Sequence, residues 1–166
     1  GFTPLYVACE NDHSKVVEKL LAVNGIGVNQ ASNNGWAPLN VACEKGAWTV
    51  VEKLLAVDGI QVNQANNNGF TPLNSACEKG HSKVVKMLLA ADGIQVNQAN
   101  NNEFTPLNSA CEKGHSKVVK LLLAVADIQV NQANEHGFTP FMSAVSNSHI
   151  VLVILFLQRG IGHNNI

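Results

Sequence analysis

The sequence has little charge of either sign and few aromatic residues. Only 14% of its 166 residues are charged, and the 11 basic and 12 acidic residues leave a formal net charge of −1. A chain without an excess of basic residues lacks the electrostatic footprint that binds nucleic acid or an anionic membrane. We therefore expect neither nucleic acid nor a membrane among its partners.

Long apolar runs are absent too. The longest covers residues 150–157 and reads IVLVILFL, and a helix of this length spans about 12 Å, far less than the roughly 30 Å of a bilayer core. The chain does not open with a basic segment followed by an apolar one, so we expect no signal peptide. It starts at Gly1 and not at a methionine, which we interpret as a fragment or a processed chain.

Motifs that carry catalysis are also missing. The sequence shows no Ser-His-Asp set, no paired carboxylates and no glycine-rich phosphate loop, which are common arrangements for nucleophilic, acid–base and phosphoryl chemistry. We therefore expect a protein that is not an enzyme and that needs no cofactor.

What the sequence does have is repetition. A Thr-Pro or Ala-Pro pair followed by leucine or phenylalanine recurs every 34 residues. A fixed period between about 20 and 50 residues indicates a stack of repeated structural units. We interpret the chain as a single domain, 1–166, with repeats at about 1–34, 35–68, 69–102, 103–136 and 137–166.

Each repeat carries the start and stop signals of two short helices, as the third repeat illustrates. Thr71 is a good N-cap, Pro72 suits the first helical position, and Gly80 stops the first helix. The second helix is predicted to start near Ser82 and to end at Gly93 in a left-handed cap, before a hairpin loop leads to the next repeat. Two helices of this length cannot bury a core alone, so each repeat must pack on its neighbours.

These motifs resemble ankyrin repeats over essentially the whole chain. The similarity lies in Thr-Pro-Leu and the alanine after it, the Gly-His pairs at 80–81 and 114–115, the Val-Val and Leu-Leu pairs, and Val-Asn. The resemblance implies an all-α solenoid, an ankyrin-repeat stack of helix-turn-helix units with short β-hairpin loops. It also implies a non-catalytic module that binds another protein through its concave face and hairpin edge.

The chain departs from the family pattern at several positions. Each unit is one residue longer than the usual 33, which we place in the loop after the second helix. Ala37 lacks the capping hydroxyl, Glu103 replaces a turn glycine and should adopt positive φ, and Asp127 replaces the glycine after the second helix. The histidine of the family motif is absent, so its hydrogen bonds must be replaced or lost; its place is taken by Tyr6, Asn40, Asn74, Asn108 and Met142.

The four cysteines also recur every 34 residues, at Cys9, Cys43, Cys77 and Cys111. Neighbouring repeats stack about 10 Å apart, whereas a disulfide needs Cα atoms within about 7 Å, so we favour small buried side chains over disulfides. The Cys-x-x-x-His spacing suggests zinc, but it supplies too few ligands, and we favour a turn histidine that bonds to backbone and expect no metal. Free thiols fit a reducing compartment, so we expect an intracellular, cytoplasmic protein.

A large aromatic residue precedes each Thr-Pro or Ala-Pro pair. One interpretation is lateral packing of hairpin on hairpin, and the other is a row of anchors for a partner protein. The two are compatible, because rings can stack and still present a face. The stripe consists of Phe2, Trp36, Phe70, Phe104 and Phe138.

The resemblance places the hairpin tips and the ends of the first helices on the binding face. There the acidic and basic residues alternate, which disfavours a strongly charged partner. The candidate partner-binding residues are Trp36, Phe70, Phe104, Phe138, Asn67, Asn68, Asn101, Asn102, Glu44, Lys45, Glu78, Lys79, Glu112 and Lys113.

The asparagines of the Val-Asn pairs look like those that some cells hydroxylate in ankyrin repeats. The acidic residue that usually accompanies them is missing, so we favour a structural role in the loop. They are Asn29, Asn63, Asn97 and Asn131.

The last predicted helix is unusually apolar. Ile150, Val151 and Ile154 stand where the third repeat has Ser82, Lys83 and Lys86, and they should form an exposed patch. We interpret this patch as a site of self-association that would make a homo-oligomer, as a contact for further repeats, or as an imperfect terminus. The alternative function is therefore a self-associating structural scaffold with no dedicated target.

Overall fold

The computed structural model describes residues 1–162, which contain ten helices. They come in five pairs, each with a first helix that starts at a proline and a second helix close behind it. The pairs are α1 (Pro4–Glu10) with α2 (Ser14–Leu21), α3 (Pro38–Lys45) with α4 (Trp48–Leu55), α5 (Pro72–Lys79) with α6 (Ser82–Leu89), α7 (Pro106–Glu112) with α8 (Ser116–Leu122), and α9 (Pro140–Ser146) with α10 (Ile150–Gln158).

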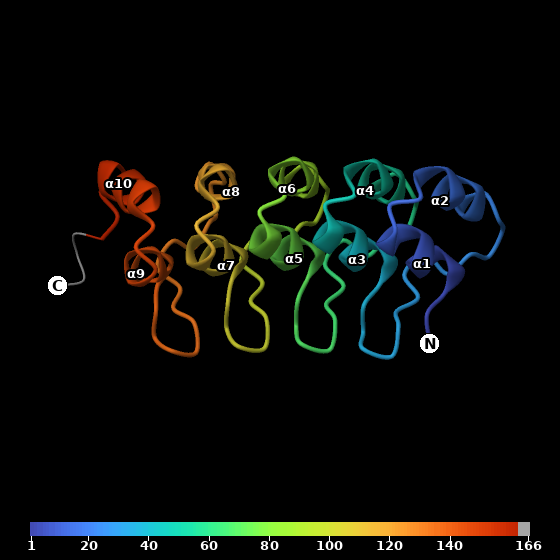
Figure 1. Cartoon of the computed structure of the whole chain (residues 1–166), viewed down its shortest axis with the longest axis horizontal. Coiled ribbons are helices and arrows are strands. Elements are labelled where there is room, and N and C mark those ends of the chain that lie inside the picture. Colours follow the sequence, from blue (N-terminus) through green and yellow to red (C-terminus); the bar gives the residue numbers. More distant parts are fainter. Residues whose placement is uncertain (163–166) are drawn as a thin grey trace.

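The pairs stack side by side into an elongated solenoid (Figure 1). The first helices form one row, the second helices form a parallel row, and long loops project beyond the row of first helices. Each first helix packs on the first helix of the next pair, and each second helix packs on the next second helix. The all-α repeat stack predicted from the sequence is thus confirmed.

The predicted signals of the first helices are confirmed in α5. The Thr71 hydroxyl accepts a hydrogen bond from the backbone N–H of Asn74, at 3.1 Å, and Pro72 stands in the first turn. Gly80 ends the helix with a positive φ of 76°, as a left-handed cap requires. The first helices therefore begin and end where local side-chain chemistry dictates.

The second helices begin as predicted but end earlier. Helix α6 starts at Ser82, and its C-cap is Ala90, not Gly93. Gly93 has its positive φ, 72°, in the turn after the helix. The prediction of a left-handed glycine cap on this helix was wrong, because the residues between Ala90 and Gly93 form a separate turn.

The loops between repeats turn back on themselves, but the described residues contain no β-strand. In the loop before α5, the backbone N–H of Asn66 donates to the Phe70 carbonyl at 3.0 Å. The return bond runs from the Phe70 N–H to Oδ1 of the Asn66 side chain, also at 3.0 Å. The Asn66 side chain thus replaces one of the two backbone hydrogen bonds that would join a pair of strands. The loop is therefore a hairpin closed by a turn and not by paired strands.

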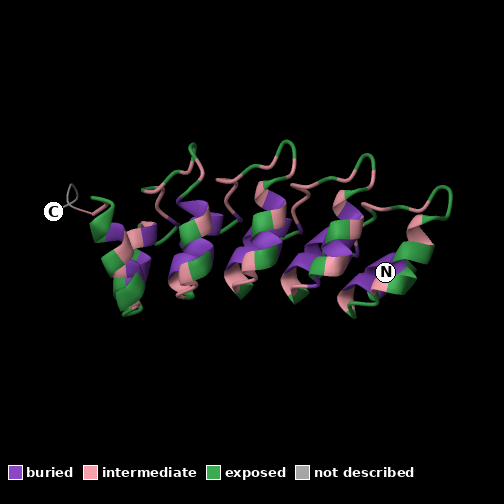
Figure 2. Ribbon diagram, turned by 90° about the horizontal axis from the view of Figure 1, so that it is seen from above, coloured by how far each residue is buried: buried purple, intermediate pink, exposed green. Residues whose placement is uncertain are grey.

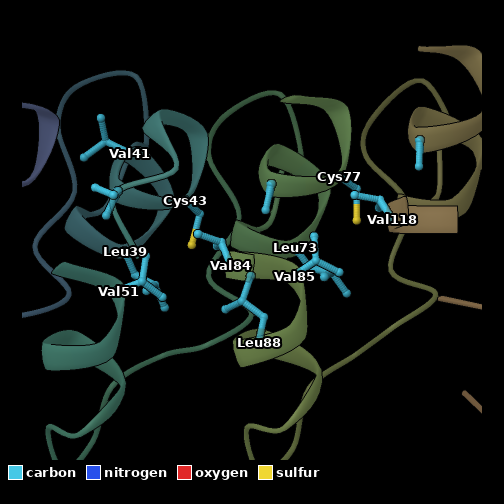
Figure 3. Close-up of a cluster of buried hydrophobic side chains, with 14 of the residues drawn as sticks. Leu39, Val41, Cys43, Val51, Leu73, Cys77, Val84, Val85, Leu88 and Val118 are labelled. Carbon is cyan, nitrogen blue, oxygen red and sulfur yellow. The ribbon is translucent and has the colours of Figure 1, made fainter. Parts of the chain in front are cut away.

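One continuous hydrophobic core runs between the helix pairs. Figure 2 shows the buried residues on the helix faces that meet neighbouring pairs, and the exposed residues on the outer faces and loops. In Figure 3, Cys43 and Cys77 point into the spaces between successive pairs, among valines and leucines. All four cysteines are free and buried, so the prediction of small buried side chains is confirmed.

The turn histidines join the third, fourth and fifth repeats to the repeat before them. Nε2 of His81 lies 2.9 Å from the Glu44 carbonyl, and Nε2 of His115 lies 2.8 Å from the Glu78 carbonyl. A Cβ on Gly80 would stand 2.5 Å from the His115 ring. This glycine is therefore needed both for its positive φ and for the close approach of the next histidine, and the predicted backbone-bonding role of the histidines is confirmed.

Asparagines also bond from repeat to repeat. The Asn40 side chain donates to the Phe70 carbonyl at 2.7 Å, which replaces the hydrogen bonds expected of the missing family histidine. In the other loop, Asn63 donates to the Gly93 carbonyl at 2.8 Å and accepts from the Gln95 N–H at 2.9 Å. The structural role predicted for the asparagines of the Val-Asn pairs is confirmed at Asn63.

The three irregular positions behave differently. Ala37 caps α3 without a side-chain hydrogen bond, as expected. Glu103 has the predicted positive φ, at 61°, whereas Asp127 does not adopt the positive φ that Gly25, Gly59 and Gly93 have at the same position of the other repeats. The loop around Asp127 adjusts its backbone and so avoids the left-handed conformation.

Candidate functional site

The loops and the first helices enclose a groove on one side of the solenoid. A hollow of about 460 Å³ lies between the third and fourth repeats, and a second of about 220 Å³ lies between the fourth and fifth. The two hollows share Phe104 and Glu112, so they are neighbouring parts of one surface, which we call the hairpin groove.

Many of the predicted binding residues meet in this groove. The rings of Phe70, Phe104 and Phe138 are half-buried, which leaves part of each ring open to solvent. Phe104 also makes an edge contact with His136, with ring centroids 6.4 Å apart. The predicted residues that line the groove are Phe70, Phe104, Phe138, Asn68, Asn101, Asn102, Glu78, Glu112 and Lys113.

Other predicted residues do not line these hollows. Trp36 packs against the hydrophobic core, so it belongs as much to the core as to the aromatic stripe. Asn67 lies at an exposed loop tip, where its carbonyl accepts from the Asn101 side chain at 2.9 Å. Glu44, Lys45 and Lys79 lie at the helix ends of the second and third repeats, outside the two hollows.

The loop tips are bonded into a continuous edge. The Asn101 N–H donates to the Asn68 carbonyl at 3.0 Å, and the Asn67 N–H donates to the Asn34 carbonyl at 3.1 Å. These bonds fix the spacing of the tips along the stack. The edge of the groove is therefore held in place before any partner arrives.

Charges at the helix ends neutralise one another. Lys79 lies 3.8 Å from one oxygen of Glu44, and Lys113 lies 3.0 Å from Glu112. Exposed pairs of this kind contribute little to stability. Their effect is to leave the groove with little net charge, as the alternating Glu-Lys sequence predicted.

Sequence reasoning missed the polar floor of the groove. Ser109 lies in the larger hollow and Ser143 in the smaller one, together with Asn134 and Asn147. A signal was available, because the same register holds Val7 and Val41 in the first two repeats and serine in the others. The switch from an aliphatic to a hydroxyl side chain marks where the groove becomes able to form hydrogen bonds.

The cysteines are unsuited to nucleophilic chemistry. Burial raises the pKa of Cys9 to about 12, and it also raises the pKa of Cys77 and Cys111 well above the usual value. A thiol in this state stays protonated at neutral pH, whereas the thiolate is the nucleophile and the metal ligand. Within residues 1–162 no three His, Cys, Asp or Glu side chains gather in a way that could hold a metal ion.

The last helix exposes the predicted apolar residues. Ile150, Val151 and Ile154 all lie at the surface of α10, while Leu152 and Phe156 fill the core beneath them. None of the helices in residues 1–162 is long and apolar enough to cross a membrane.

These features define a class of protein: a solenoid of helix-turn-helix units with projecting loops and a groove between loops and helices. Comparison with protein families makes the class specific. The family model described as ankyrin repeats, in 3 copies, matches residues 5–100 and 93–166. The chain therefore belongs to the ankyrin-repeat family, whose members are in general protein-interaction modules and not enzymes. A search of curated proteins finds no match.

Proposed function

We propose that this chain is a non-catalytic binding module that holds another protein in the hairpin groove. The observation that carries the proposal is the convergence of Phe70 and Phe104, two asparagine-rich loop tips and Glu112 on one hollow of about 460 Å³. Aromatic rings with one open face are typical anchors of protein interfaces. The family's general role supports the same conclusion.

The chemistry of the groove favours an extended segment of low net charge. The repeats place phenylalanine at 34-residue steps, so an extended segment would meet a similar subsite in each repeat. Apolar side chains would contact Phe70 and Phe104, and backbone groups would bond to the asparagine tips and to Ser109. The paired charges at the helix ends would disfavour a strongly acidic or basic partner.

The proposal is tested by comparing what two variants and the wild-type protein retain from a lysate of the source cells. Phe70→Ser with Phe104→Ser should lose the retained protein while keeping helical circular dichroism and melting temperature. The control, Lys86→Glu with Lys120→Glu, changes the opposite face and should retain it. If the phenylalanine variant folds normally and retains the same protein, the groove is not the binding site.

A second candidate function rests on the exposed aliphatic residues of α10. In this alternative the chain is a self-associating scaffold with no dedicated target, and copies meet through Ile150, Val151 and Ile154. Changing these three residues to lysine should then convert a homo-oligomer into a monomer in analytical ultracentrifugation. An oligomeric state that does not change would refute this alternative.

Two further expectations belong to the same proposal. We propose that residues 1–166 act as a single domain of five repeats, with the boundaries given by the 34-residue period. We also propose an intracellular, cytoplasmic location, because four buried free thiols suit a reducing compartment.

A further inference from the structure

The row of second helices carries an uneven pattern of charge on its outer face. Two outward positions recur on each of these helices at steps of 34 residues, and both are exposed except at Thr49, which is half-buried. On α2 and α4 the second of them is acidic, at Glu18 and Glu52, whereas α6 and α8 carry lysine there, at Lys86 and Lys120. The near-zero net charge of the chain therefore hides a basic region on the second helices of the third and fourth repeats.

Four lysines surround a single hollow between α6 and α8. Lys83 and Lys86 come from α6, Lys117 and Lys120 come from α8, and the hollow measures about 490 Å³. All four side chains are exposed, and in residues 1–162 none has a carboxylate within ion-pair distance. Nζ of Lys83 lies 2.9 Å from the ring centroid of Trp48, which holds that ammonium group at the surface.

The same two positions become aliphatic on the next helix. Val151 and Ile154 of α10 follow Lys117 and Lys120 in register, and α10 packs beside α8. Val151 is 60% exposed and Ile154 is 51% exposed, and Ile150 beside them is 68% exposed. Because the second helices stand in one row (Figure 1), the lysines and the aliphatic side chains share one face of the molecule.

We propose that the outer face of α6, α8 and α10 attaches the protein to an anionic phospholipid membrane. Stable attachment of a peripheral protein needs two signals, a basic patch and an apolar group that enters the boundary between headgroups and acyl chains. The four lysines supply the first signal, and Ile150, Val151 and Ile154 supply the second. The surface does not span the bilayer, and it leaves the hairpin groove free for a protein partner.

Other occupants fit this face less well. An acidic protein segment would pair with the lysines but would leave the three exposed aliphatic side chains beside them in water. A second copy joined through α10 would bring its own Lys117 and Lys120 toward those of the first, and like charges repel. An anionic bilayer satisfies both halves of the face at once.

The test is co-sedimentation with vesicles of phosphatidylcholine alone or mixed with phosphatidylserine. The wild-type protein should bind only the mixed vesicles, and binding should weaken as salt is raised. Lys86→Glu with Lys120→Glu restores the residue type found at Glu18 and Glu52, so the fold should tolerate it. This variant should bind at least about tenfold more weakly.

Two further variants test whether vesicle binding depends on where the lysines and aliphatic side chains lie, or only on the net charge of the protein. Lys45→Glu with Lys113→Glu makes the same change in net charge at the ends of the first helices α3 and α7, away from the row of second helices, and should bind vesicles like the wild type. Val151→Ser with Ile154→Ser leaves the charge unchanged and should lower binding several-fold, because less apolar surface enters the bilayer.

Three results would overturn the proposal. The first is a wild-type protein that does not bind mixed vesicles, whether or not it captures an acidic protein through these lysines. The second is an equal loss of binding in the Lys45 and Lys113 variant. The third is a lipid-free oligomer that Val151→Ser with Ile154→Ser dissociates, with no vesicle binding, which would assign the face to a second copy.

Discussion

The hydroxyl that Ala37 lacks affects the hydrogen bonding of Asn40. In the third repeat the Oδ1 atom of Asn74 accepts hydrogen bonds from the backbone N–H and the hydroxyl of Thr71, at 3.1 and 2.7 Å. In the second repeat Ala37 has no hydroxyl to offer, and Oδ1 of Asn40 is buried without a partner among the described residues. The departure from the family pattern therefore leaves both an uncapped helix and an unsatisfied acceptor.

Restoring the hydroxyl should stabilise the protein. Ala37→Thr would cap α3 and give Asn40 a donor, and the matching site in the third repeat already holds a buried threonine. We expect the free energy of unfolding to rise by about 1 kcal/mol. Urea denaturation measures the change, and Thr71→Ala should cost a similar amount. An unchanged or lower stability of Ala37→Thr would show that the threonine does not fit this site.

The backbone conformation of Glu103 destabilises the fold by an amount similar to the missing cap at Ala37. Its φ of 61° lies in the left-handed region, where the other repeats have Gly35, Gly69 and Gly137. Glu103→Gly should therefore raise the free energy of unfolding by about 1 kcal/mol. Thermal unfolding of this variant beside Glu135→Gly, a nearby loop residue for which no such gain is expected, tests the prediction. A fall in melting temperature for Glu103→Gly would refute it.

The buried thiols should make stability depend on pH in the alkaline range. Burial raises the pKa of Cys43 and Cys77 in the folded state above the usual 9.0. Folded thiols then keep their protons when unfolded thiols lose theirs. Their contribution is therefore fully present below about pH 9 and is lost as the pH rises further, by up to about 1.4 kcal/mol per pH unit for each thiol.

This prediction is checked by urea denaturation from about pH 8 to about pH 11. The wild-type free energy of unfolding should fall over this range, and Cys77→Ala should fall with a shallower slope because one thiol is missing. A slope that does not depend on Cys77 would mean that its thiol titrates alike in both states.

At the scale of helices and loops, the first helices were the most predictable elements. Thr71, Pro72 and Gly80 act locally, so their sequence alone predicts where α5 starts and ends. The end of α6 was not predictable in this way, because the backbone N–H groups of Ala90 and Ala91 already bond to the carbonyls three residues earlier, in a turn that no capping residue before Gly93 marks. The described residues contain no strand, since the Asn66 side chain accepts from the Phe70 N–H a hydrogen bond that a backbone carbonyl would accept in a strand pair.

The loop asparagines should each contribute to the cohesion of the stack. Asn63 bonds to both the Gly93 carbonyl and the Gln95 N–H of the next repeat. Asn63→Ala leaves these two groups to water, and we expect a loss of about 1 kcal/mol in the free energy of unfolding. Gln95→Ala is the matched control, because only its backbone takes part, and it should be nearly neutral. Equal losses in the two variants would contradict a specific role for Asn63.

At the scale of the whole molecule, repetition places distant residues on common surfaces. The 34-residue period puts the aromatic stripe and the asparagine tips at one register, and the resemblance to ankyrin repeats assigned them to one edge; Phe70, Phe104 and Phe138 do line one groove. The basic face could not be anticipated from a net charge of −1. The face forms because α6, α8 and α10 pack side by side, and the net charge of a chain carries no information about where its charges lie.

The two opposite faces give the molecule room for two functions. The hairpin groove lies between the loops and the first helices, and the basic and apolar face lies on the second helices (Figure 1). A protein held in the groove would leave the outer face free for a membrane. The two sites share none of their lining residues, so variants can separate them.

The most direct test of the central claim is hydrogen–deuterium exchange of the protein with and without the partner that it captures from a lysate. We predict that exchange slows in the hairpin segments 66–70 and 100–104 and at the end of α7, and that it stays unchanged in α6, α8 and α10. Slower exchange confined to the second helices, with none in the hairpins, would contradict the assignment of partner binding to the groove.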